Sequence, residues 1–206
     1  MEVDWEFELG GAALVDGVPA GETPVAEAPI IAAHWPGFVD LRRFPERAVQ
    51  LPEAAELPGL AEALAMLNAD ASPVWTSKCD VWPIADFADF DADELDAPPG
   101  CAAHAMGCYI DLLPRSDQQW QLPAEAAAAC RHVCNLLHAV HLRCCRVDLV
   151  IRSAVIAPGR VDGTMMDLGI TAYLTACGAS QAQATAALEV ALAAFAHVLC
   201  DDSKLQ

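Results

Sequence analysis

The sequence contains few basic residues. Lys and Arg together number 11 in a chain of 206 residues, against 29 Asp and Glu, so the formal net charge at pH 7 is -18. Residues 1–100 hold 20 acidic and 4 basic residues, whereas residues 101–206 hold 9 and 7. Nucleic acids and anionic membrane surfaces repel a protein of this charge, so neither is an expected partner. A macromolecular partner that is basic or apolar is favoured instead.

Several motifs that would indicate a specific chemistry are also missing. The chain has no glycine-rich phosphate-binding loop, no G-x-S-x-G nucleophile turn and no H-E-x-x-H helix. It also contains no C-x-x-C pair of the kind that most zinc sites use. These absences remove the commonest sequence signatures of nucleotide-binding proteins, hydrolases and metalloproteases, so function must be sought in looser groups of residues.

The N-terminal segment lacks the features of an export signal. Residues 1–6 are mostly acidic, whereas a secretory signal begins with basic residues and continues with an apolar run. The most apolar stretch, residues 182–200, is rich in alanine and is interrupted by polar side chains, which favours a packed helix over a membrane span. We therefore expect a cytoplasmic protein. Its nine cysteines, an odd number, are expected to be reduced.

Apolar residues make up 55% of the chain and charged residues 19%, so the chain must fold around a core. Its length favours a single domain over residues 1–206. Period-two alternation predicts strands at 3–15, 30–35, 38–41, 74–82, 107–113, 143–156 and 168–176. Helical spacing predicts helices from Leu51 to Asn68, from Pro123 to His141 and from a Ser180 cap to Cys200. The strands before residue 50 have the weakest patterns.

This order of elements predicts an α+β fold made of β-β-α units. An antiparallel sheet with helices packed on one face is the natural arrangement, and a ferredoxin-like or related sandwich would satisfy it. The strands of residues 143–156 and 168–176 are expected to pair as an antiparallel hairpin. The uncovered sheet face and the tryptophans Trp5, Trp75 and Trp82 suggest self-association, most simply as a homodimer.

Cys177 is the first candidate for a catalytic residue. It ends a predicted strand and precedes the capped N-terminus of the last helix, where the helix dipole lowers the pKa of a thiol. The alternative is a buried thiol at the end of a strand. The neighbouring residues match no known nucleophile motif, so this alternative is favoured.

A second group of residues could bind a metal ion. Cys130, Cys134 and His141 fall within about 40° of one another on a helical wheel, and cysteine and histidine are both zinc ligands. Val133 and Leu137 lie on the same face, so an apolar stripe filled with small thiols is the favoured alternative.

Residues 83–100 form a long acidic segment that ends in Pro98-Pro99-Gly100. Repulsion between its carboxylates predicts a mobile loop that docks a basic partner or gates a pocket. The alternative is that Phe87, Phe90 and Leu95 dock as one short amphipathic turn and hold the segment in place.

Two functional hypotheses follow from these observations. The first is a non-catalytic accessory or small-molecule-binding protein of an intracellular pathway, because the sequence assembles no catalytic set. The second is a thiol- or metal-assisted enzyme that uses Cys177 or the Cys130, Cys134 and His141 stripe. The sequence identifies no cofactor for either hypothesis.

Overall fold

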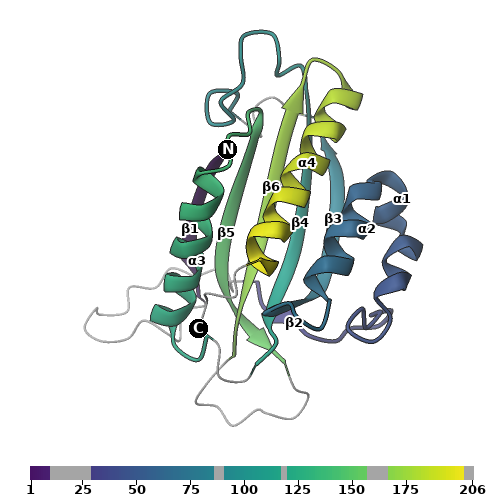
Figure 1. Cartoon of the computed structure of the whole chain (residues 1–206), viewed down its shortest axis with the longest axis vertical. Coiled ribbons are helices and arrows are strands. Elements are labelled where there is room, and N and C mark those ends of the chain that lie inside the picture. Colours follow the sequence, from purple (N-terminus) through teal and green to yellow (C-terminus); the bar gives the residue numbers. More distant parts are fainter. Residues whose placement is uncertain (10–28, 86–90, 117–119, 157–166, 202–206) are drawn as a thin grey trace, which may run out of the picture.

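The computed structural model describes residues 1–9, 29–85, 91–116, 120–156 and 167–201. These residues form an α+β fold with a mixed, open sheet of six strands (Figure 1). The strands are β1 (Glu2–Glu8), β2 (Ile31–Ala32), β3 (Val74–Ile84), β4 (His104–Pro114), β5 (Cys145–Val155) and β6 (Asp167–Gly178). The helices are the 3-10 helix η1 (Pro45–Gln50) and the α-helices α1 (Pro52–Glu56), α2 (Pro58–Leu67), α3 (Pro123–His138) and α4 (Gln181–Cys200).

The centre of the sheet is antiparallel. Strand order is β1-β5-β6-β4-β3, and β6 pairs antiparallel with both of its neighbours. The predicted hairpin between β5 and β6 is therefore confirmed as a strand pair, although its connector, residues 157–166, lies outside the described residues.

One edge of the sheet differs from the prediction. β1 and β2 both pair with β5, and both run parallel to it. A fully antiparallel sheet was therefore the wrong expectation. Alternation in a sequence identifies a strand and its two faces, but it does not specify the partner strand or its direction.

Alternate side chains of the central strands form the main core together with the helices. Met106, Cys108, Ile110 and Leu112 of β4 belong to this cluster, as do Val147, Leu149 and Ile151 of β5 and Ile170, Ala172 and Leu174 of β6. Leu64 of α2, Leu137 of α3 and Phe195 of α4 are fully buried within it. Full burial of one large apolar side chain contributes about 1.5–3 kcal/mol, so this cluster supplies most of the driving force for folding.

Two helices differ in length from their predictions. The single helix expected from Leu51 to Asn68 is divided at Leu57, whose backbone is not helical because a proline follows it. The helix expected to reach His141 ends at His138, where its last turn is closed by the bond from the Val140 amide to the Leu137 carbonyl.

The last helix begins at its predicted cap. The Ser180 hydroxyl accepts a hydrogen bond from the Gln183 amide at 3.3 Å, and the Gln183 side chain accepts one from the Ala179 amide at 3.0 Å. α4 is long and apolar enough to cross a membrane by length and composition alone. Its buried residues Leu188, Leu192 and Phe195 nevertheless pack in the main core, as expected for the central helix of a packed domain.

The N-terminal strands are shorter than predicted. β1 ends at Glu8, and residues 10–15 of the expected strand lie outside the described residues. The strand expected near residues 30–35 contains only Ile31 and Ala32. Residues 38–41 do not form a strand, because Asp40 instead accepts hydrogen bonds from Arg42 in a turn.

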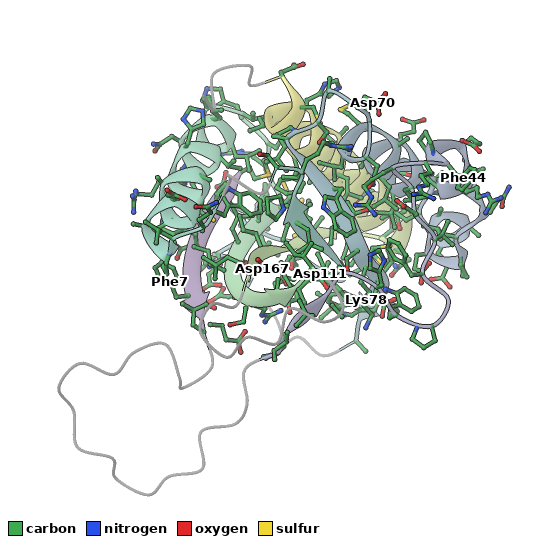
Figure 2. All side chains as sticks on the ribbon, turned by 90° about the horizontal axis from the view of Figure 1, so that it is seen from below. Phe7, Phe44, Asp70, Lys78, Asp111 and Asp167 are labelled. Carbon is green, nitrogen blue, oxygen red and sulfur yellow. The ribbon has the colours of Figure 1, made fainter. Side chains whose placement is uncertain are left out.

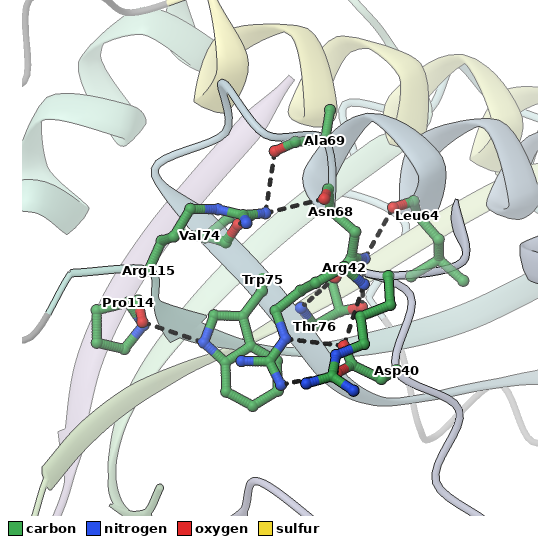
Figure 3. A network of polar contacts seen from close by, with 11 residues as sticks. Asp40, Arg42, Leu64, Asn68, Ala69, Val74, Trp75, Thr76, Pro114 and Arg115 are labelled. Atoms are coloured by element: carbon green, nitrogen blue, oxygen red, sulfur yellow. Dashed lines mark hydrogen bonds and ion pairs between the residues drawn. The ribbon is translucent and has the colours of Figure 1, made fainter. Parts of the chain in front are cut away.

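A buried asparagine joins α2 to β3 (Figure 3). The Asn68 side chain donates to the Leu64 carbonyl at 2.8 Å and to the Thr76 hydroxyl at 2.7 Å, and it accepts from the Thr76 amide at 3.1 Å. Arg115 donates to the backbone carbonyls of Asn68 and Ala69, both at 2.9 Å. These side-chain bonds pair backbone groups in the segment between α2 and β3 that would otherwise lack a hydrogen-bond partner.

We predict that Asn68→Ala lowers the free energy of unfolding by about 1–3 kcal/mol, because it leaves the Thr76 amide and hydroxyl without their partner in a buried position. Urea unfolding followed by circular dichroism measures this change. Glu62→Ala, at an exposed position of the same helix, should change stability by less than about 0.5 kcal/mol. Equal effects of the two substitutions would contradict the prediction.

Candidate functional site

The side chains that point away from the main core divide the sheet into three zones. At one end, Trp75, Leu113 and Ala154 pack with Ile31 and Ala33 in a separate apolar cluster. At the other end, Ala105 and Cys177 pack with Leu95 in a third cluster. Residues outside the central strands therefore cover both ends, and the middle of this face is polar.

We call this middle zone the polar band. It consists of Lys78 of β3, Tyr109 and Asp111 of β4, Arg152 of β5, and Thr171 and Tyr173 of β6. Tyr109 pairs directly with Tyr173, and Asp111 pairs directly with Thr171. Figure 2 shows Asp111 and Lys78 on the side of the sheet away from α4.

Asp111 is the most unusual member of the band, because its residue is only 8% exposed. Its carboxylate accepts a hydrogen bond from the Thr171 hydroxyl at 2.6 Å. Burial raises the pKa of Asp111, while the Thr171 hydrogen bond and the charges of Arg152 and Lys78 act in the opposite direction. A buried carboxylate of this kind is costly, and such groups are concentrated at functional sites.

Arg152 organises one side of the band. Its guanidinium donates to the Thr171 hydroxyl at 3.1 Å and to the Tyr173 hydroxyl at 3.0 Å. It also forms an ion pair with Glu8 of β1, with Nε at 2.8 Å from the carboxylate. The Arg152 side chain is only 11% exposed. Its bonds to Glu8 of β1 and to Thr171 and Tyr173 of β6 hold the guanidinium in one position.

Aromatic rings extend the band across the sheet. Trp82 and Tyr109 have ring centroids 6.2 Å apart, and Tyr109 and Tyr173 have centroids 6.0 Å apart. The Lys78 ammonium lies 5.8 Å from the centre of the Tyr109 ring, and a hydrogen bond with Tyr109 is the main cause of its raised pKa. The band thus presents a carboxylate, two cations and two phenol rings on adjacent strands.

Sequence reasoning missed the importance of Asp111. Residues 107–113 were expected to form a buried strand, and β4 contains them. An acidic residue inside a buried apolar strand was the signal that could have found the site, because a buried charge needs partners. The partners come from β5 and β6, and local sequence does not specify which residues lie opposite one another.

The structure places Cys177 at the end of β6, directly before α4, as predicted. The residue is 1% exposed, and burial raises the pKa of its thiol to about 12. This direction is opposite to the one expected from the helix dipole, because loss of hydration outweighs it. A catalytic role for Cys177 stays a prediction.

The residues of the expected metal stripe are not brought together. Cys130 and Cys134 lie on α3 with exposures of 0% and 6%, whereas His141 follows the end of that helix and is exposed. Burial raises the pKa of Cys130 to about 12. Among the described residues, no three His, Cys, Asp or Glu side chains are grouped so that they could hold a metal ion. The proposed metal role therefore gains no support from the geometry.

The described part of the acidic segment is attached to the sheet. Leu95 is 2% exposed and packs against Ala105 and Cys177. Glu94 forms an ion pair with Arg146 at 3.0 Å, and Asp96 forms one with Arg143 at 3.2 Å. This arrangement matches the alternative in which Leu95 docks. Phe87 and Phe90 lie outside the described residues.

No family model, no curated protein and no solved structure matches this chain.

The raised pKa of Asp111 predicts a pH dependence of stability. Because the folded-state pKa lies above the ordinary value of 3.8, the folded protein binds this proton more tightly than the unfolded chain does. The contribution of Asp111 to stability should therefore fall as pH rises from 3.8 through the folded-state pKa. Asp111→Asn removes this titration, so its stability relative to the parent protein should increase over the same range.

Urea unfolding of both proteins from about pH 4 to about pH 8 measures the difference, and NMR titration of the Asp111 carboxyl carbon gives the pKa directly. A pKa below 3.8, or a stability difference that does not change with pH, would contradict the prediction.

Proposed function

We propose that this protein is a non-catalytic accessory protein that binds a small polar molecule on the polar band. The observation that supports this most strongly is the buried Asp111 carboxylate, which lies between Lys78 and Arg152 on a sheet face away from α4. A protein gains little stability from such a group, because the cost of dehydrating a charge offsets its attraction to partners. A role in ligand binding would account for a buried carboxylate at position 111.

The proposal includes an arrangement of layers. The helices gather on one face of the sheet, and the polar band occupies the middle of the other face. The core residues of α2, α3 and α4, which contact one parity of the central strands, support this arrangement. The apolar clusters at both ends leave a polar stretch between them that is suited to a ligand of small size.

The chemistry of the band indicates what the ligand carries. Asp111 accepts hydrogen bonds, so the ligand presents an N–H or O–H donor to it. Lys78 and Arg152 are donors and cations, so an oxygen-rich or anionic group fits beside them. The rings of Tyr109 and Tyr173 contact flat or apolar parts of a ligand. An amino acid, a hydroxy acid or a similar metabolite combines these features.

We expect compounds of this class to raise the melting temperature of the protein in a thermal-shift panel of amino acids, hydroxy acids, amines and nucleosides. Asp111→Asn should weaken binding of the stabilising compound about tenfold or more, since a hydrogen bond to a charged group contributes about 1.5–3 kcal/mol. Isothermal titration calorimetry then measures the dissociation constants.

Glu56→Gln is the matched control, because it removes one carboxylate charge at an exposed position of α1. This variant should bind as the parent protein does. The proposal fails if no compound of the panel stabilises the protein, or if the two variants bind equally well.

We also propose that the protein forms a homodimer. Exposed apolar side chains of the described residues include Phe7, with 44% exposure, and Trp35, with 41%. Trp75, which was expected to supply aromatic surface, is instead buried and donates a hydrogen bond from its indole to the Pro114 carbonyl. A basic protein partner is a further proposal, supported by the exposed acids Asp4 and Glu6 on the edge strand.

Analytical ultracentrifugation at micromolar concentration should show a species of twice the monomer mass, because exposed aromatic surface favours association. A single species of 21.8 kDa would contradict the dimer. Added salt should leave a dimer held by apolar contacts intact, whereas it should dissociate a complex with a basic partner.

A further inference from the structure

We propose that Cys144 and Cys177 form a cross-strand dithiol that a low-molecular-weight disulfide, such as oxidised glutathione, converts into an intramolecular disulfide. The two residues lie at the end of the sheet where β5 begins and β6 ends. This inference is independent of the proposed ligand site.

The register of β5 and β6 places the two cysteines opposite each other. The last paired residues of these strands are Cys145 and Ala176, so the next residues along the antiparallel pair are Cys144 and Cys177. The Cys177 amide donates a hydrogen bond to the Cys144 carbonyl at 2.9 Å. Residues opposed in this way have Cα atoms about 5.5 Å apart, and disulfides span Cα separations of about 4.4–6.8 Å. The backbone is thus already at the right spacing.

The side chains share one environment. Cys144 packs against the small cluster that contains Leu95, Ala105 and Cys177. The Cys144 side chain is also close enough to raise the pKa of the Cys177 thiol. Cys145, the adjacent cysteine, belongs instead to the main core and lies on the other side of the sheet. Register and packing therefore select Cys144 as the partner of Cys177.

The backbone of Cys144 gives an independent indication. Its φ angle is +61°, in the left-handed region that favours glycine. A cysteine adopts this conformation at a cost in free energy, and such costs are concentrated where a side chain has a role. Here the conformation holds Cys144 beside Cys177 one residue before β5 begins.

The difference in exposure between the two thiols indicates that Cys144 reacts first. Cys144 is partly exposed, whereas Cys177 is 1% exposed. The Cys144 thiolate attacks one sulfur of oxidised glutathione, the bond between the two glutathione sulfurs breaks, and one glutathione thiolate leaves. The Cys177 thiolate then attacks the Cys144 sulfur, forms the Cys144–Cys177 bond and releases the second glutathione. The protein loses two protons and two electrons, and the reagent is reduced to two thiols.

The experiment uses the full chain, reduced, freed of reductant and then incubated with oxidised glutathione. We expect the loss of two free thiols in a thiol titration and a Cys144–Cys177 cross-linked peptide in non-reducing mass mapping. Dithiothreitol should reverse both changes. Cys177→Ser should stop the reaction at the first step and leave one glutathione on Cys144.

Cys101→Ser is the matched control, because Cys101 is partly exposed and lies near enough to Cys177 to influence its thiol. This variant should form the Cys144–Cys177 bond as the parent protein does. The inference is overturned if no thiols are lost, if the mapped bond joins Cys101 to Cys177, or if Cys177→Ser carries no glutathione on Cys144. Circular dichroism of each variant confirms that it is folded before the reaction.

Discussion

Side-chain alternation along β4, β5 and β6 is the constraint on which the rest of the structure depends. One parity of each strand is apolar, because its side chains share the main core with residues of α2, α3 and α4 and are buried from water. Side chains of the other parity are apolar at both ends of the sheet, where they belong to two smaller apolar clusters. Polar side chains of this parity lie in the middle. The polar band is therefore located by packing. Among the described residues, it lies between the two apolar clusters.

The sequence was sufficient to predict the elements whose signals are local. Alternating residues identified β5 and β6, and Ser180 with Gln183 identified the start of α4, because these patterns depend on residues a few positions apart. The parallel pairing of β1 with β5 could not be predicted in this way. It depends on contacts between residues more than 140 positions apart, for which period and propensity carry no information.

The candidate site shows the same division between local and distant information. Lys78 is one of only two lysines in the chain, but nothing nearby in the sequence connects it with Asp111 or Arg152. The sheet order brings these residues together on β3, β4 and β5, with β6 lying between β4 and β5. The helical-wheel prediction that placed His141 beside Cys130 assumed a helix reaching His141. Because α3 ends at His138, the helical wheel does not apply to His141.

The arginines differ in how much their ion pairs stabilise the fold. Arg143 pairs with Asp96 between side chains that are 70% and 53% exposed, where screening by water leaves an ion pair worth about 0–1 kcal/mol. Arg152 is 11% exposed and joins Glu8, Thr171 and Tyr173, so it contributes more to holding β1 against the sheet. In a chain with a net charge of -18, a buried arginine also offsets repulsion among the acids around it.

β6 carries both Thr171 of the polar band and Cys177 of the thiol pair, on the same side of the strand. They are six positions apart, which corresponds to about 20 Å at about 3.3 Å per residue. Coupling over such a distance requires an element with two alternative arrangements. β6 is hydrogen-bonded to β4 on one side and to β5 on the other, and its core-facing side chains are fully buried. A strand held in this way has a single arrangement, so a bond at Cys177 constrains the start of β5 without altering the geometry around Asp111.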